Sequence, residues 1–369
     1  SFSSPTRSRA ADTRPRRPGA AAATGGGAGC PHNGAMKRTA LVAGTAVAAL
    51  AATVLWSFSV GRFPVSPADV LRALLASVGG GESGLAPNVE ALVLQVRAPR
   101  LFAALAVGAA LAGAGAAFQN LFKNPLVSPD ILGVSAGCAL GAGLAILFAL
   151  PIVAVQGLAF AGGLAAVALV VAVGAWVRGR DPILTLILTG VVVGSLFGAG
   201  IALVKYVADP YNQLPAITFW LLGSFGGALP GDLAVAVPVI LAGLVPLVLL
   251  RWRIDLLALS EDEARSLGLD VSKLRLGVIV CATLVTAAAV ALAGVIGWVG
   301  LVIPHAARLL VGARFARVLP LSLVLGAAFM LAVDTLCRTV AATEIPPGVA
   351  TAFVGTPVFI VLLAATFRR

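Results

Sequence analysis

The sequence predicts an all-α, polytopic membrane protein with about ten transmembrane helices and a short outer half-helix between the fifth and the sixth. Of the 369 residues, 59% are hydrophobic and 11% are charged, and the mean hydropathy is +1.02. A water-exposed surface of this size needs more charge, so a soluble domain is excluded. The apolar runs are about 20 residues long and do not alternate in polarity, which favours spanning helices over barrel strands.

The chain before the first apolar run differs from the rest in composition. Residues 1–35 are rich in Ser, Arg, Pro, Ala and Gly, and we expect them to form a disordered basic leader. Met36 is followed by two basic residues and an apolar run, and it is a candidate for the native start. A cleavable secretory signal is the alternative, but further spans follow the first one. Residues 36–369 are predicted to form a single transmembrane domain.

Hydropathy places ten spans in this domain. They are 39–60, 99–122, 131–150, 152–177, 183–205, 233–250, 275–294, 295–312, 318–341 and 348–367. The eighth is short, is interrupted by glycine and contains Pro304, His305 and Arg308, so we expect it to pack wholly against protein. Residues 214–227 are too short to cross after their proline, and they predict the half-helix at the membrane edge.

The distribution of basic residues predicts that both termini are cytoplasmic. In this orientation 20 of the 26 Lys and Arg residues lie on the inner side, as the positive-inside rule requires. Inner loops thus account for the net charge of +11, and we expect no nucleic acid partner. Arg97 and Arg100 are exceptions on the outer face.

Glycine recurs at every fourth position in two spans, at Gly133, Gly137 and Gly141 and at Gly190, Gly194 and Gly198. Stacked small residues let helices approach closely in lipid. We expect these glycines to pack helices within one subunit.

The longest predicted inner loop, 251–275, contains five of the fifteen acidic residues. Ser260 and Glu263 have the spacing of a capping box, and Gly268 is a helix stop. An apolar stripe runs through the loop at Leu256, Leu257, Leu259, Ala264 and Leu267. A short amphipathic helix on the inner side is a place where a partner protein can exert force. A solvated charged loop is the alternative.

The sequence contains no motif of a catalytic or metal site. A phosphate-binding loop, a zinc-protease motif and a nucleophile elbow are all missing, and the four cysteines share no metal-binding spacing. Asp334 is the one acid well inside a span, and Arg338 one turn later can neutralise it. An ion-coupled secondary transporter, which needs unpaired acids or broken-helix ion sites in the membrane, is the alternative from another class.

Four segments, 97–137, 263–270, 294–310 and 344–363, resemble in this order the permease subunits of type II ABC importers, the uptake family for vitamin B12, haem and ferric siderophores. The resemblance implies a homodimer in the lipid of a bacterial cytoplasmic (inner) membrane. It also implies two ABC ATPase subunits, which would bind ATP and Mg²⁺, and a soluble periplasmic or extracellular binding protein. This chain would bind no cofactor and would not itself be an enzyme.

The resemblance also implies roles for particular residues. The helix that contacts the ATPase would contain Glu263, Ala264, Arg265, Leu267 and Gly268. The binding protein would dock on Arg97, Arg100 and Arg338, which we expect to be exposed on the outer rim. The translocation path would be lined by Thr189, Gly194, Ser195, Gly198 and Leu222. The cytoplasmic gate would include Trp298, Pro304 and His305. An iron chelate, siderophore or haem, is the expected substrate, and cobalamin and molybdate or tungstate are the alternatives.

Overall fold

The computed structural model describes residues 31–61, 63, 65–81, 83–177 and 182–367, and every regular element in this part of the chain is helical. The first half contains α1 (Pro31–Ser59), α2 (Pro67–Gly79), α3 (Pro87–Ala91), the π-helical segment η1 (Leu92–Arg97), α4 (Ala98–Leu121), the 3-10 turn η2 (Pro129–Leu132), α5 (Val134–Leu147), α6 (Ile152–Val177) and α7 (Pro182–Val207). The second half contains α8 (Gln213–Leu222), α9 (Pro230–Leu249), α10 (Arg251–Asp255), the 3-10 turn η3 (Leu256–Ala258), α11 (Glu261–Ser266), α12 (Val271–Ala293), α13 (Val299–Val311), α14 (Phe315–Thr339) and α15 (Pro347–Phe367).

Seven of the described helices are long and apolar enough to cross a membrane. They are α1, the continuous helix from α3 to α4 (Pro87–Leu121), α6, α7, α9, α12 and α14. The shorter apolar helices α5 and α13 and the Pro347–Leu362 part of α15 lie at the three other predicted spans, and α8 lies at the predicted half-helix. The all-α polytopic fold is confirmed, and the number of ten crossings stays a prediction.

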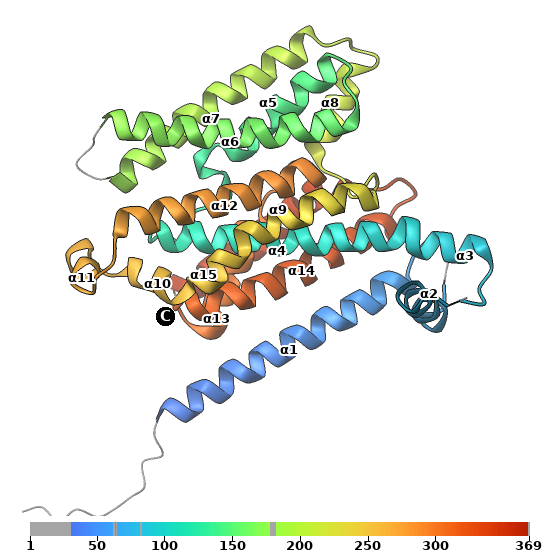
Figure 1. The fold of residues 1–369 in the computed structure, drawn as a ribbon, viewed down its shortest axis with the longest axis horizontal. Helices are drawn as coiled ribbons and strands as arrows, with labels where there is room; N and C mark the ends of the chain where they lie inside the picture. The colour runs from blue at the N-terminus through green and yellow to red at the C-terminus, as the bar shows by residue number, and fades with distance from the viewer. Residues whose placement is uncertain (1–30, 62, 64, 82, 178–181, 368–369) are drawn as a thin grey trace, which may run out of the picture.

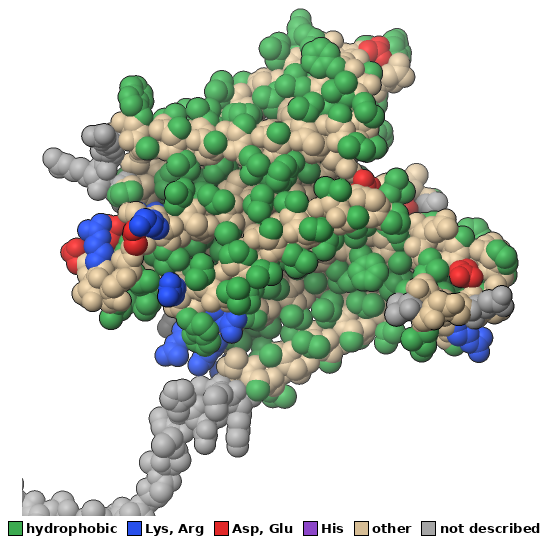
Figure 2. Space-filling model, viewed as in Figure 1, with side chains coloured by type: hydrophobic (Ala, Val, Ile, Leu, Met, Phe, Trp, Pro, Cys, Tyr) green, Lys and Arg blue, Asp and Glu red, His purple; other side chains and the backbone are tan. Residues whose placement is uncertain are grey.

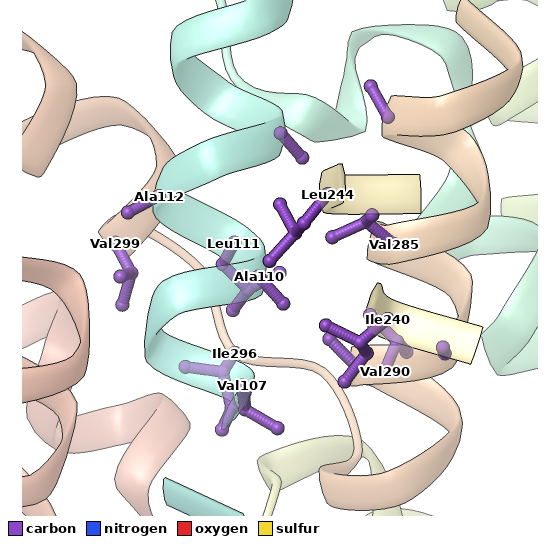
Figure 3. Close-up of a cluster of buried hydrophobic side chains, with 14 of the residues drawn as sticks. Val107, Ala110, Leu111, Ala112, Ile240, Leu244, Val285, Val290, Ile296 and Val299 are labelled. Carbon is purple, nitrogen blue, oxygen red and sulfur yellow. The ribbon is translucent and has the colours of Figure 1, made fainter. Parts of the chain in front are cut away.

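The helix that contains α4 forms the centre of the bundle (Figure 1). In its most apolar 18-residue stretch 78% of the residues are buried, against 17% for α1. Leu111 of α4 lies next to Leu244 of α9, which faces Val285 of α12, and Val107 of α4 lies next to Ile296 (Figure 3). Because lipid tails are as apolar as these side chains, close packing and dispersion hold the contact rather than the expulsion of water.

Glycines bring the helix backbones into direct contact. A Cβ atom on Gly108 of α4 would lie 2.2 Å from the carbonyl oxygen of Gly326 in α14. On Gly137 and Gly141 of α5 it would lie 2.3 Å and 2.0 Å from carbonyl oxygens of α6. Any larger residue would push these pairs apart. The predicted packing of the Gly133–Gly141 series within one subunit is confirmed.

Helix α1 begins earlier than the sequence predicts. It starts at Pro31 and already includes Met36, so residues 31–35 belong to this helix. The predicted leader otherwise lies at residues 1–30, outside the described residues.

The eighth predicted span also starts too early. Residues 294–298 are not helical, and α13 begins at Val299. Trp298 has a φ of +70°, an unusual backbone angle for a residue other than glycine. The apolar composition of this segment therefore reflects its burial between helices and not a helical conformation.

Arg97 and Arg100 do not lie at the start of a helix, where the predicted span 99–122 places them. The helix begins at Pro87 and continues through both residues. Pro99 lacks the N–H that a regular helix would use at this point. The π-helical segment accommodates it, with the N–H of Ala98 donating to the carbonyl of Val93, five residues back. The helix thus starts 12 residues, or about three turns, before the predicted start at residue 99. Both arginines face neighbouring segments of the protein.

Candidate functional site

Charged side chains of the described residues gather at the two ends of the bundle. Figure 2 shows basic and acidic side chains together over the end that carries α10 and α11. Among the described residues, no group of three or more His, Cys, Asp or Glu side chains could hold a metal ion. The candidate sites are therefore the loop 251–275, the charges at the opposite end and the clefts between the helices.

Helix α11 has the predicted capping box. The N–H of Glu263 donates to Ser260 Oγ (3.3 Å), and the N–H of Ser260 donates to Glu263 Oε2 (3.0 Å). The N–H and the hydroxyl of Ser260 both donate to the Glu263 carboxylate, and these two hydrogen bonds hold the pKa of Glu263 below its ordinary value. Gly268, with a φ of +78°, ends the helix as predicted. The loop is thus a built element and not a solvated coil.

Polar contacts fasten the loop to two central helices. Asn120 Nδ2 at the end of α4 donates to the carbonyl of Ile254 (2.9 Å), and Lys123 Nζ donates to the carbonyl of Leu259 (2.6 Å). The Asp255 carboxylate accepts the N–H groups of Phe315 and Ala316, the first two residues of α14. It therefore satisfies donors that the helix itself leaves open. A displacement of the loop will act directly on α4 and α14.

The exposed face of α11 differs from the predicted one in one residue. Leu267 is 61% exposed and Arg265 is 60% exposed, so both can meet a partner. Ala264 is 1% exposed and packs inside the protein. Its predicted contact with a partner is wrong, because it is the residue that attaches α11 to the bundle.

At the opposite end, Arg100 joins two carboxylates from distant parts of the chain. Its Nη2 donates to Asp334 Oδ1 at 2.9 Å, and its Nη1 donates to Glu344 Oε2 at 3.0 Å. The Asp334 side chain is fully buried and that of Glu344 is 43% exposed. Arg338, the predicted partner of Asp334, lies farther away, with its Nε at 3.8 Å from Oδ2. Asp334 is paired as predicted, but mainly with Arg100.

Arg97 and Arg338 hold the end of α1. Arg97 donates to the carbonyls of Phe58 and Phe63, and Arg338 donates to the carbonyl and the hydroxyl of Ser57. The last carbonyls of a helix have no partner within it and attract positive charge. The two arginines supply both the hydrogen-bond donors and the positive charge.

The prediction that the three arginines are exposed on a rim is wrong. Arg97 is 5% exposed, Arg338 is 8% exposed, and the Arg100 side chain is 13% exposed. Each already has partners within the chain. We call these three residues with Asp334 and Glu344 the arginine–carboxylate cluster, and its contacts indicate that it joins α1, α4 and α14.

A cleft of about 720 Å³ lies between α8, the segment 294–298 and α15, and we call it the α8–α15 cleft. Its lining is mainly apolar or small, as a path for a bulky solute requires. The lining residues are Leu221, Leu222, Val295, Gly297, Trp298, Gly348, Val349, Ala352, Phe353, Thr356 and Pro357. The structure thus brings together Leu222 and Trp298. Trp298 follows the end of α12 that is opposite to the loop 251–275 and lies beside α8, so it is not at the cytoplasmic end where the resemblance placed the gate.

Two of the predicted gate residues meet through an aromatic residue that the sequence analysis missed. The Phe359 ring of α15 lies edge to face with both Trp298 (6.3 Å between centroids) and His305 (6.1 Å). Pro304 is buried within α13. The sequence pattern gives little indication of a role for Phe359, because this residue lies in a uniformly apolar span. Its partners His305 and Trp298 are 54 and 61 positions away.

The predicted path residues of α7 do not line the α8–α15 cleft. Thr189 is 8% exposed, and Gly194 lies against Gly133 with a virtual Cβ distance of 3.7 Å, so both serve packing. Ser195 is exposed, and its hydroxyl donates to the carbonyl of Val191. Gly198 has open space above it. Of the five predicted path residues, Leu222 alone lines this cleft, and the path itself stays a prediction.

Comparison with known proteins gives consistent results along the whole domain. The model of the FecCD transport family matches residues 49–365. The molybdate import system permease protein MolB of Haemophilus influenzae is 39% identical over 85% of this chain and 92% of its own length. The hemin transport system permease protein HmuU of Yersinia pestis is 38% identical over 73% of this chain and 82% of its own. A solved structure assigned to the metal-chelate type of ABC transporters, in an inward-facing conformation, covers 88% of this chain and 99% of its own, with 36% identity and a TM-score of 0.78.

Proposed function

Because the chain belongs to the FecCD transport family and is a permease subunit of type II ABC importers, we propose that it moves a metal chelate across the cytoplasmic membrane with energy from a partner ATPase. The chelate, an iron–siderophore or haem, is received from a periplasmic or extracellular binding protein. The termini and the loop 251–275 lie on the cytoplasmic side.

The observation that carries this proposal is the construction of the loop 251–275. A capped helix exposes Leu267 and Arg265 at the end of the bundle, while Asn120, Lys123 and Asp255 fasten the loop to α4 and α14. Such an element transmits a push from a docked subunit to the membrane helices. ATP and Mg²⁺ belong to that subunit, and the chain itself is not an enzyme.

The translocation path is formed with a second copy of the chain. The α8–α15 cleft is bordered by Phe353, which is 78% exposed, and α7 exposes Val192 and Leu196 at 68% and 62%. A second copy related by a two-fold axis would cover these surfaces and close the path between the two clefts. Lipid surrounds the remaining apolar faces.

The substrate class is supported by two of the comparisons and contested by one. The haem permease favours an iron chelate, and the metal-chelate transporter favours a chelate without naming its metal. The molybdate permease matches 85% of this chain, against 73% for the haem permease, so molybdate is the second candidate.

We expect uptake of an iron chelate in proteoliposomes that contain the permease and its ATPase, with ATP inside and the binding protein outside. Ferric siderophore, haem, cobalamin and molybdate are supplied separately as labelled solutes. One of the iron chelates should accumulate at least about tenfold faster than molybdate, because the binding protein selects the solute and a site that pairs a solute's polar groups discriminates by factors of this order or more. Exclusive uptake of molybdate would establish the second candidate, and no ATP-dependent uptake of any of the four would contradict the proposed function.

A further inference from the structure

A second cavity, of about 590 Å³, lies beside the loop 251–275, and we call it the α9–α12 groove. It runs between the end of α9, the turn at α10 and the first three turns of α12. The mechanism proposed above does not use it. It nevertheless includes Leu267 and Gly268, which immediately follow α11.

The inner part of the groove is apolar and lies at membrane depth. Leu247, Leu274 and Cys281 line it, and both flanking helices are among those able to cross a membrane. A Cβ atom on Gly277 would have no neighbour within 4 Å, so bare backbone forms part of the floor. Its volume of about 590 Å³ lies in the range of pockets that hold small-molecule ligands.

The groove is continuous with the surface that faces lipid. Side chains on either side of it are exposed and apolar: Val245 and Leu249 on α9, at 48% and 71%, and Leu276 and Val280 on α12, at 49% and 55%. A membrane-spanning protein presents such surfaces to acyl chains. A lipid can therefore enter the groove sideways from the bilayer.

Two basic residues and one acidic residue line the mouth of the groove, Arg253, Lys273 and Asp270, so its net charge is positive. Arg253 lines it, and within the described part of the chain its guanidinium has no ion pair or side-chain hydrogen bond in the structure. Lys273 also lines it but is paired with Asp270 at 3.0 Å. Next to the mouth, Arg251 lies over the ring of Trp252, which is 64% exposed. An exposed tryptophan with arginines is typical of the depth of lipid headgroups.

We propose that the α9–α12 groove binds an anionic phospholipid, with one acyl chain along Leu247 and Leu274 and the phosphate on Arg253. Continuity with the lipid-facing surface favours a lipid over a segment of a protein partner. Because the same groove includes Leu267 and Gly268, the bound lipid contacts the segment that follows α11 and supports its position.

The test counts the lipids that remain bound after extraction from bilayers of equal parts phosphatidylglycerol and phosphatidylcholine. Native mass spectrometry is applied to the permease with its ATPase and to the permease alone. We expect phosphatidylglycerol to be retained in preference to phosphatidylcholine in both samples. Arg253→Gln should lower this preference about fivefold, the factor that corresponds to the ~1 kcal/mol of a basic residue at an anionic surface. Gly277→Leu should remove the retained lipid, because the side chain fills the groove.

Two matched variants serve as controls. Arg314→Gln removes an exposed arginine outside the groove, and Gly44→Leu adds the same side chain at an open glycine of α1. Both should retain lipid as the original chain does. Equal retention of the two lipids, or unchanged retention in Gly277→Leu with normal size-exclusion behaviour, would overturn the proposal. If the permease alone retained the lipid but the complex did not, the ATPase and not a lipid would occupy the groove in the complex, and the proposal would be wrong.

Discussion

Asp334→Ala is expected to destabilise the permease by about 3–5 kcal/mol, the range observed when one partner of a buried ion pair is removed. The Asp334 side chain is fully buried and accepts hydrogen bonds from Nε and Nη2 of Arg100. Without it, Arg100 keeps only the half-exposed Glu344, and Arg338 loses its nearest carboxylate. Two positive charges would then lie close together in the bundle.

Thermal unfolding in detergent, followed by size-exclusion fluorescence, measures this effect. Glu344→Ala is the matched control, because that carboxylate is 43% exposed and an exposed ion pair contributes about 1 kcal/mol or less. Replacing both Arg100 and Asp334 by leucine should recover part of the loss, since no charge is then left unpaired. An Asp334→Asn variant with unchanged stability and no transport would contradict this structural role and indicate a proton carrier.

Leu267→Asp is expected to lower substrate uptake at least about tenfold while the chain folds normally and ATP hydrolysis continues. The side chain is 61% exposed, and exposed substitutions usually change stability by about 0.5 kcal/mol or less. Burying the new carboxylate against the ATPase would cost about 1–3 kcal/mol or more, because its hydration is lost without a partner. The ATPase would then turn over without moving α4 and α14.

Uptake and phosphate release are measured in the same proteoliposomes, so that their ratio reports the uncoupling. Leu310→Asp, at an exposed leucine in the last turn of α13, is the control for an acid placed elsewhere. Ala264→Arg is not a suitable variant, because Ala264 is buried and the change would detach α11. Gly277→Leu, which fills the α9–α12 groove without changing α11, separates loss of the lipid from loss of the ATPase contact. Unchanged uptake in Leu267→Asp would exclude a role of this surface in coupling.

The helices could be predicted because their positions and ends depend on residues that are close together in the sequence. The half-helix α8, the capping box at Ser260 and the stop at Gly268 all follow from a few neighbouring residues. The amphipathic helix α2 was missed although its signals were present, with Ser66 as a cap, Pro67 in the first turn and Gly80 in the left-handed region after its end.

The candidate site was harder to predict because it depends on contacts between distant residues. Arg100 and Asp334 are 234 positions apart, and no local pattern indicates which carboxylate an arginine will meet. The predicted span begins at residue 99, whereas the π-helical segment continues the helix through Pro99, and Arg97 is buried. Phe359 became visible as the partner of Trp298 and His305 only when α13 and α15 were placed together.

The central claim is that the chain forms the path and a partner ATPase supplies the energy. The most direct measurement is the driving force of uptake, in proteoliposomes with the permease, its ATPase and the binding protein. Our account predicts that uptake requires enclosed ATP, stops when the ATPase is inactivated, and persists when a protonophore or a sodium ionophore is added. Uptake by the permease alone, driven by an imposed proton or sodium gradient without ATP, would contradict it.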